Sequence, residues 1–344
     1  NLLIKLKKLT VMKNLFLAVA VMAMACVGCA KEEPSEPKSL PDLVPIEFAP
    51  ATITRSTPIN DFESGKSIGI YGKETLSDAP GTVTADWMNN LPLTNSGSAW
   101  ALASTHYFKK GYSYSFVAYY PYNASATVTD SSVEYTVNPD VAQQEDFLYA
   151  PAVTRTYAAA DEAVPNAVKF QFYHALAQVK FSAKTKEDYS KYLDVTITKV
   201  EIQELVSAAT LAFADGTWTP TVGRTGNFSQ TVNNTLGTDM VTLKNGADDT
   251  NVLMLLPQNA AGKKVVLTYT TKNKNGDTSL DQTDVTIQLT IPADAGANTW
   301  TGNNIYEYQV TLDMGAVLGW GNAAFDEPVI NPWGTPKPPI DMGN

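Results

Sequence analysis

Two segments near the C-terminus alternate apolar and polar residues with a period of two. They are DVTIQLTI at residues 284–291 and YEYQVTLD at residues 306–313. Successive side chains of a strand point to opposite faces, so this pattern predicts strands with one buried and one solvated face. No window of the chain shows a long helical period. The sequence therefore predicts an all-β fold with few short helices.

Other β-rich runs recur along the chain and are separated by turn residues. The runs lie at residues 42–54, 66–72, 112–120, 133–137, 146–150, 168–182, 193–205, 210–213, 252–256 and 265–271. Glycine-containing hairpin turns are predicted at residues 109–111, 215–216 and 275–277. Strands at this spacing predict two β-sandwiches in tandem.

The composition changes at residues 151–165, PAVTRTYAAADEAVP, which are rich in alanine and poor in large apolar side chains. We interpret this stretch as a loop that precedes a new sheet, with a domain boundary near Pro165. The predicted domains are residues 56–165 and 166–344. At 344 residues and 44% hydrophobic composition the chain can bury a sizeable core.

A short apolar segment precedes the only two cysteines of the chain. A signal sequence that starts at Met12 fits better than one that starts earlier. Lys13 supplies its positive charge, and residues 15–25 form its apolar stretch, which is too short for a permanent membrane-spanning helix. Gly28 then precedes Cys29. This order resembles a bacterial lipoprotein signal, in which the peptide is cut before a cysteine whose thiol is acylated. Residues 1–28 are therefore predicted to be a signal peptide and Cys29 the lipidation site.

Lipidation explains why a cysteine stands here and nowhere later. Each buried methylene contributes about 0.8 kcal/mol, so several acyl chains on Cys29 would hold the protein at the outer membrane. Two alternatives stay open. The signal could be cut before Cys26, or it could be an ordinary secretory signal with incidental cysteines.

Residues 29–55 are predicted to form a lipidated leader. An acidic, proline-containing tether comes first, followed by the strand-like run DLVPIEFAPATIT at residues 42–54. Pro45 and Pro50 cannot donate ladder hydrogen bonds, so this strand belongs at a sheet edge or is added late. Arg55 closes the run.

The charge balance excludes one class of partner. The net charge is −10, and four lysines but no acidic residue precede Cys29, so the exported part is more acidic still. Affinity for phosphate backbones depends on clustered Lys and Arg, so we expect no nucleic-acid partner. The absence of cysteine after Cys29 also excludes disulfides, thiolate metal sites and cysteine nucleophiles from the folded part.

The residues give little support for catalysis. The chain has two histidines, His106 and His174, and each is interpreted as a packed or surface residue. No GxSxG, HExxH, Walker A or GxGxxG context occurs. Asp248-Asp249 and the turn at 275–277 are interpreted as ordinary turns rather than calcium sites. We therefore expect no enzyme, no metal site and no cofactor, although the many carboxylates leave a glycosidase pair open.

The aromatic run at residues 112–122 has two interpretations. Flat rings on an exported protein could stack on sugars, but tyrosines in such a strand more often pack with their hydroxyls at the rim. We favour packing.

Six blocks follow one another in a characteristic order. They are KSIGIYG at 66–72, YFKKGYSYSFVAYYPY at 107–122, DFLYAP at 146–151, FYHALAQVKFSAK at 172–184, NNIYEYQVTLD at 303–313 and INPWG at 330–334. Together they resemble the fimbrillin family, the type V pilins of anaerobic Gram-negative bacteria.

This resemblance implies two tandem transthyretin-like β-sandwich domains with Greek-key character. It also implies export as a lipoprotein and cleavage after an arginine by a trypsin-like surface protease, which removes the first strand. A strand of the next subunit then fills the exposed groove. The matching arginine is Arg55, so Ser56 would become the new N-terminus, and residues 317–333 or beyond would be the donor.

The implied function is that of a structural subunit of a fimbria that supports adhesion. Its partners would be other pilin subunits, an Arg-specific protease and the outer membrane, where the precursor would be anchored. The alternative is an uncut surface lipoprotein that binds glycans or host proteins through its aromatic surface.

Overall fold

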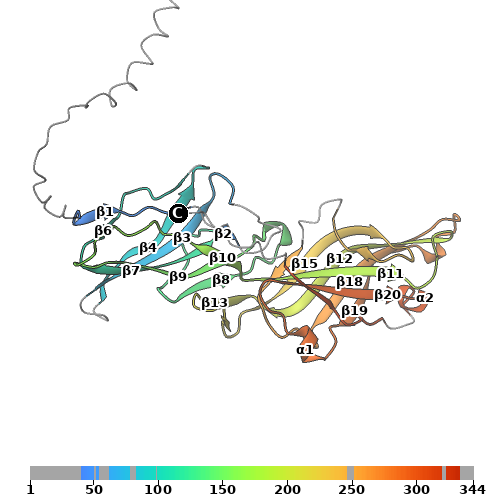
Figure 1. Ribbon diagram of the computed structural model, residues 1–344. Helices are drawn as coiled ribbons and strands as arrows, with labels where there is room; N and C mark the ends of the chain where they lie inside the picture. Colours follow the sequence, from blue (N-terminus) through green and yellow to red (C-terminus); the bar gives the residue numbers. More distant parts are fainter. Residues whose placement is uncertain are drawn as a thin grey trace, which may run out of the picture. The chain divides into compact units, whose positions relative to one another are not determined.

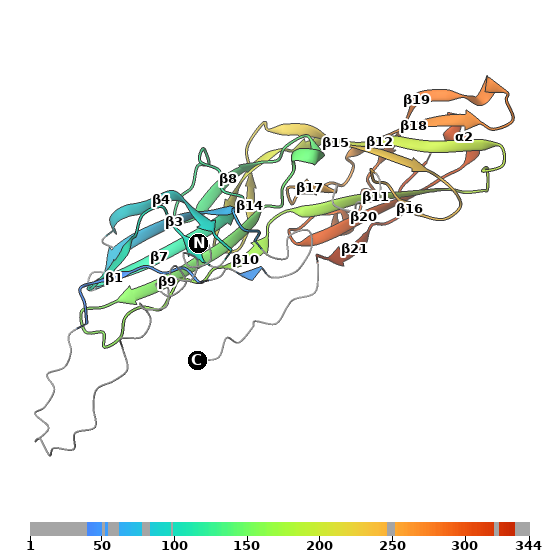
Figure 2. The ribbon, with the colours of Figure 1, turned by 90° about the horizontal axis from the view of Figure 1, so that it is seen from above.

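The computed structural model describes residues 40–49, 52–53, 62–77, 83–97, 99–245, 252–319 and 323–333. Nearly all regular structure in these residues is β-strand (Figures 1 and 2). The helices that they contain are α1 (Ala295–Asn298), α2 (Met314–Val317) and two short 3₁₀ turns at 141–143 and 278–280. The predicted all-β fold of sandwiches with few short helices is confirmed.

A seven-stranded sheet dominates the N-terminal half, drawn in blue to green in Figure 1. Its order is β2 (Thr52–Ile53), β10 (Gln171–His174), β9 (Leu148–Tyr157), β7 (Tyr112–Tyr120), β3 (Ser67–Leu76), β4 (Val83–Asn95) and β5 (Trp100–Ala101). Neighbours are antiparallel except β2 and β10, which are parallel. Two smaller sheets accompany it. They are β1 (Leu43–Pro45) with β6 (Tyr107–Lys109), and β14 (Trp218–Pro220), β13 (Ala208–Ala212) and β8 (Ser132–Thr136).

Two further sheets form the C-terminal half, drawn in yellow to red. One has the order β16 (Val241–Thr242), β11 (Ala177–Thr185), β20 (Asn304–Leu312) and β21 (Val329–Pro332), with β17 (Leu253–Leu255) also paired to β11. The other has the order β15 (Thr225–Thr235), β12 (Leu193–Val206), β18 (Lys264–Asn273) and β19 (Gln282–Thr290). Within the first of these sheets β11 and β20 are parallel.

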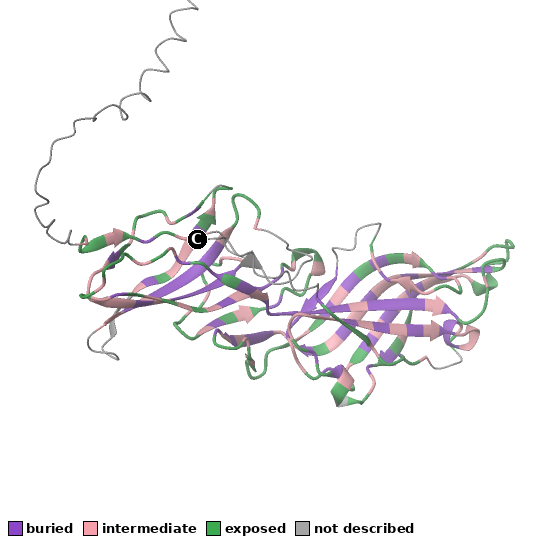
Figure 3. Cartoon of the chain, in the orientation of Figure 1, coloured by how far each residue is buried: buried purple, intermediate pink, exposed green. Residues whose placement is uncertain are grey.

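The core follows the period-two pattern of the sequence. Along β20 every second side chain from Tyr306 to Leu312 is buried, and along β12 the buried residues include Leu193, Val195 and Ile197. Figure 3 shows this alternation as bands of buried and exposed residues along the strands. Burial of these apolar side chains is the main stabilising contribution. The two alternating segments that predicted half-buried strands, at 284–291 and 306–313, are confirmed as β19 and β20.

The loop predicted from Pro151 is wrong over its first half, because β9 continues to Tyr157. The register between β7 and β9 shifts between Phe116 and Ala118, so that two residues of β9 lie opposite Val117. Pro151 lies in this irregular part of the ladder, where the strand does not need its missing N–H. The composition of residues 151–157 did not reveal the bulge.

The predicted turns are correct, but one of them does not join paired strands. The turns at 215–216 and 275–277 connect the antiparallel pairs β13–β14 and β18–β19. The turn that ends at Gly111, which has φ +89°, instead connects β6 to β7. β6 pairs with β1, whereas β7 pairs with β3 and β9. The expected hairpin is therefore a connection between two sheets.

Strands from both sides of the predicted boundary at Pro165 share sheets. β10 pairs with β9, and β13 pairs with β8. Residues Ala175 and Leu176 link β10 directly to β11, so the chain passes from the first group of sheets to the second with two intervening residues.

Candidate functional site

The first described strand is an added edge of the N-terminal sheets. We call residues 41–49 and 52–53 the leader segment. Its strand β1 pairs antiparallel with β6. One residue further on, the amide of Ile46 donates to the carbonyl of His106 at 2.8 Å. The proline-bearing strand predicted from the sequence is thus present, and among the described residues β6 is its neighbour in the sheet.

The leader segment then bridges both ends of the seven-stranded sheet. Phe48 forms backbone bridges to Trp100 of β5 and to Val168, which precedes β10. The amide of Ala49 donates to the Val168 carbonyl at 2.9 Å, and the Val168 amide donates to the Glu47 carbonyl at 2.8 Å. β2 then runs parallel to β10. β5 lies at one end of the sheet and β10 lies next to the other end, where β2 is the edge strand, so the leader segment contacts both ends.

Two side chains of the leader segment point into the core. Ile46 is buried, and the half-buried ring of Phe48 has its centroid 6.2 Å from those of Phe116 and Phe170. Ile46 and Phe48 are two residues apart and therefore share one face of the strand. Leu43, at 53% exposed, remains at the surface. The arrangement is that of a strand that inserts alternate side chains between two edges.

Cys29, Arg55 and Ser56 lie outside the described residues. The predicted lipidation and cleavage sites are therefore not placed, although the described part of the leader segment ends at Ile53, two positions before Arg55.

The other two arginines after Cys29 lie in hydrogen-bonded parts of the fold. Arg155 lies in β9, where Nε donates to the Asn166 carbonyl at 3.0 Å and a terminal nitrogen donates to the Ala167 carbonyl at 2.7 Å. Arg224 is exposed in the turn before β15, where its amide donates to the Thr221 carbonyl at 3.2 Å. A protease binds its substrate as a free extended peptide. Arg155 lies in a strand that is already paired within a sheet, and Arg224 follows a hydrogen-bonded turn, so neither site offers such a peptide.

The last described strand attaches differently. β21 pairs antiparallel with β20, and all four of its side chains are exposed. Trp333, the next residue, is completely buried and stacks on His174 with ring centroids 4.4 Å apart. His174 Nδ1 lies 2.5 Å from Asp146 Oδ2, and both of these side chains are fully buried. No local sequence pattern predicts this pairing, because Asp146 and His174 are far apart in the chain and lie in separate apolar runs.

The geometry gives neither histidine a catalytic environment. His106 is half-buried, donates from Nδ1 to the Ser104 carbonyl at 3.1 Å, and packs edge-on against Trp87. The ring of His174 is fully buried, stacks on Trp333 and pairs with Asp146. In the part of the chain that the structure describes, no three metal-ligating side chains gather in one place.

The aromatic strand β7 packs into the core, as expected. Tyr114, Tyr119 and Tyr120 are each at most 4% exposed. Desolvation raises the pKa of Tyr114 and of Tyr120 to about 12. These rings cannot form the sugar-stacking surface considered from the sequence.

Across the described ranges, no helix has the length and apolar character needed to cross a membrane. The features assembled so far define a β-sandwich protein whose first strand is an added edge. Residues 54–333 match the model of the fimbrillin-like family, and the chain belongs to that family. No curated protein sequence matches it.

Solved structures with the same fold include fimbrial and adhesion proteins of Bacteroides. A fimbrial protein from Bacteroides vulgatus ATCC 8482 has a TM-score of 0.60 at 16% identity, over 84% of this chain and 99% of that chain. Putative cell adhesion proteins from Bacteroides ovatus ATCC 8483 and Bacteroides uniformis ATCC 8492 have TM-scores of 0.51 and 0.50 at 18% and 22% identity. They cover 86% and 85% of this chain and 99% and 100% of their own. Family membership supports a role as a fimbrial subunit at the cell surface.

Proposed function

We propose that the chain is the lipid-anchored precursor of a fimbrial subunit that polymerises by strand exchange. In this proposal Cys29 carries the lipid, a surface protease cuts after Arg55, and Ser56 becomes the N-terminus of the mature subunit. The leader segment occupies the acceptor groove until it is removed.

The observation that carries this proposal is the way the leader segment is inserted. Its backbone pairs with β6 and with Val168, and Ile46 and Phe48 cover an apolar region that contains Phe116 and Phe170. Without it, those rings and a row of backbone donors and acceptors would be open to water. An open edge of this kind accepts an extended strand from another chain.

The position of Arg55 adds to the argument. It directly follows the inserted strand, whereas Arg155 and Arg224 lie in a paired strand and a hydrogen-bonded turn. A cut after Arg55 would separate the leader from the folded body without breaking either sandwich.

β21 is the best donor within the described residues. It lies at a sheet edge with all its side chains exposed, and Trp333 is its one deeply buried attachment. The four residues of β21 can therefore leave their sheet with little loss of apolar burial, and withdrawal of the Trp333 ring is the main cost.

The test uses purified full-length precursor and an arginine-specific protease. We expect one major new N-terminus at Ser56, followed by growth of filaments visible by electron microscopy. The Arg55→Gln variant should stay uncut and monomeric, whereas the matched Arg224→Gln variant should be cut and polymerise normally. A first cut after Arg155 or Arg224, or filaments from the Arg55→Gln variant, would contradict the proposal.

The alternative function, an uncut surface lipoprotein that binds glycans, is favoured by one feature, a cavity lined by aromatic and polar side chains. A protein that binds sugars and never polymerises after cleavage would support this alternative.

A further inference from the structure

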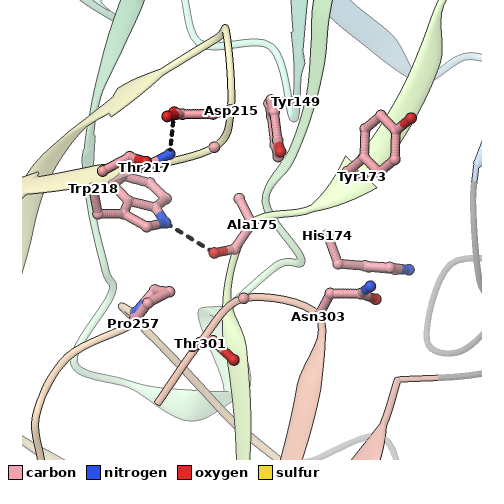
Figure 4. A pocket seen from close by; sticks show the side chains of 12 residues that line it. Tyr149, Tyr173, His174, Ala175, Asp215, Thr217, Trp218, Pro257, Thr301 and Asn303 are labelled. Atoms are coloured by element: carbon pink, nitrogen blue, oxygen red, sulfur yellow. Dashed lines mark hydrogen bonds between the residues drawn. The ribbon is translucent and has the colours of Figure 1, made fainter. Parts of the chain in front are cut away.

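A cavity of about 420 Å³ opens where β9 and β10 meet the turn between β13 and β14. Figure 4 shows Asp215 and Trp218 on one side of it, Tyr149 and Tyr173 on the other, and the loop with Thr301 and Asn303 below. Its volume lies in the range of small-molecule sites, about 300–1,000 Å³. It is separate from the leader segment and from the groove that this segment fills.

Three aromatic rings line the cavity, and each is held by contacts of its own. Tyr149 and Tyr173 are cross-strand partners whose ring centroids are 5.7 Å apart. Trp218 donates from Nε1 to the Ala175 carbonyl at 2.9 Å and packs against Phe147. All three lining rings are half-buried. The cavity therefore offers preformed apolar faces that are partly open to solvent.

Gly216 lies directly against the side chain of Tyr149. It has φ +74°, and a Cβ added to it would overlap the Tyr149 hydroxyl. The turn at residues 215–216 can therefore approach the tyrosine only because glycine stands there. This close approach places Asp215 at the rim of the same cavity as the rings.

The polar groups are mostly neutral hydrogen-bonding groups. In the described part of the chain no hydrogen bond engages the hydroxyl of Tyr149 or of Tyr173, and the side-chain oxygen of Asn303 is buried without a partner. Asp215 accepts from the Thr217 amide at 2.9 Å, which lowers the pKa of its carboxyl and keeps it ionised at neutral pH. No Lys or Arg is among the described lining residues, and the side chain of the one histidine there, His174, is fully buried against Asp146.

This combination suits a polyhydroxylated ring. Flat aromatic faces pack against the C–H face of a sugar, and hydroxyl, amide and carboxylate groups bind its hydroxyls. An anion would lack a cationic partner and would be repelled by Asp215. A quaternary ammonium would use the aromatic rings but would leave the neutral hydrogen-bonding groups without a partner.

We propose that this cavity binds one neutral pyranose residue of a glycan, with the rings of Tyr173, Tyr149 and Trp218 supplying apolar faces and Asp215 and the tyrosine hydroxyls binding its hydroxyl groups. The site needs neither cleavage at Arg55 nor exchange of a strand. A protein that fails to bind glycosides could therefore still polymerise, and a protein that fails to polymerise could still bind them, so the two proposals are tested separately.

The test is ligand-observed saturation-transfer NMR on the full-length protein. The probes are the methyl glycosides of galactose, mannose, N-acetylglucosamine and fucose, with choline chloride and sodium phosphate as competing chemistries. We expect saturable binding of at least one glycoside and no saturation transfer to choline. Phosphate has no protons to observe, so its binding is followed by ³¹P line width and by competition with the glycoside, and we expect neither to change.

Two variants locate the binding. Asp215→Asn keeps the acceptor for the Thr217 amide but removes the charge, and Tyr173→Ala removes one ring. Each should weaken glycoside binding by about tenfold or more, which is the size of one lost good contact. Tyr192→Ala, at a tyrosine that is 64% exposed and does not line the cavity, is the matched control and should bind as the parent does.

Three results would overturn the proposal. They are no binding of any of the four glycosides, glycoside binding that both Asp215→Asn and Tyr173→Ala leave unchanged, and binding of choline or phosphate in their place. Asp215→Asn is an exposed substitution that keeps its turn, so it tests the site even where Tyr173→Ala fails to fold.

Discussion

The first and last strands of the described chain are both short and both lie at sheet edges, yet they attach in different ways. The leader segment pairs with β6 and Val168 and inserts Ile46 and Phe48 into the core. β21 pairs only with β20 among the described strands, exposes all four side chains and is fixed by Trp333.

This difference indicates how each strand could be displaced. The leader segment is attached at several points through both backbone and side chains. While the chain is uncut at Arg55, we expect the segment to stay in place and protect the groove. β21 has a ladder of backbone bonds, each contributing about 1 kcal/mol, and a single large side chain. Only the leader segment therefore needs a protease to leave.

Removal of the leader segment is expected to have the largest effect. Loss of Ile46, Phe48 and the backbone bonds should lower the free energy of unfolding by roughly 5 kcal/mol. Protein cut after Arg55 and freed of its leader should bind a dye for exposed apolar surface and should self-associate. Adding a peptide of residues 41–54 should reverse both effects.

The control is the same peptide with Ile46→Asp and Phe48→Asp, which keeps the backbone but cannot enter the core. If this peptide restores the cut protein equally well, the side chains do not determine attachment, and the contrast with β21 is wrong.

At the other end of the chain, Trp333→Ala should release β21. Removing a fully buried indole costs about 3 kcal/mol or more, and here the loss should be confined to the strand. Hydrogen exchange of the amides in β20 and β21 should become faster, while β12 and β18 keep their protection. Ile330→Ala, at a side chain that is 45% exposed, should change little. Equal effects of the two substitutions would mean that β21 is held along its whole length.

A single substitution in the leader segment should cost less than its removal. Phe48→Ala leaves the backbone pairing in place and removes a half-buried ring, so we expect a loss of about 2 kcal/mol and faster proteolysis of residues 41–53. Leu43→Ala changes an exposed residue of the same segment and serves as the control. Thermal unfolding with limited proteolysis measures both, and matching behaviour of the two variants would show that Phe48 is not an anchor.

The strands of this molecule could be predicted where local pattern determines them. The alternation at 284–291 and 306–313 depends only on neighbours in sequence, and so does the glycine turn at 215–216. The extent of β9 could not be predicted, because Pro151 is acceptable only in a bulge opposite Val117. That bulge depends on a strand distant in the sequence.

The candidate sites show the same limit. Pro45 and Pro50 indicated an edge strand before Arg55, and β1 is one. The cavity could not be found from local pattern, because Tyr149, Tyr173, Asp215 and Asn303 come from four separate parts of the chain. The one available signal was the turn at 215–216, which we interpreted only as a hairpin turn. The stacking of Trp333 on His174 likewise depends on tertiary contacts alone.

The last prediction, a difference in stability near zero at neutral pH, concerns the sheet to which the leader segment attaches. The ring of Tyr114 packs 5.0 Å from that of Phe108 in β6, and its hydroxyl accepts from the Lys109 amide at 2.7 Å. Burial raises the pKa of Tyr114 from 10.0 to about 12. Between these values the unfolded chain loses the phenolic proton and the folded chain keeps it, so stability falls as pH rises.

One such group contributes a slope of about 1.4 kcal/mol per pH unit. Tyr114→Phe should therefore be slightly less stable at pH 8, where it lacks the hydrogen bond to Lys109, but should lose less stability between pH 10 and 12. Denaturant unfolding across that range measures the slope, and release of the leader segment can be followed by its proteolysis. If the parent protein and Tyr114→Phe lose the same stability per pH unit, the titration of Tyr114 is not coupled to folding. Alkaline pH would then not release the leader segment in preference to β21.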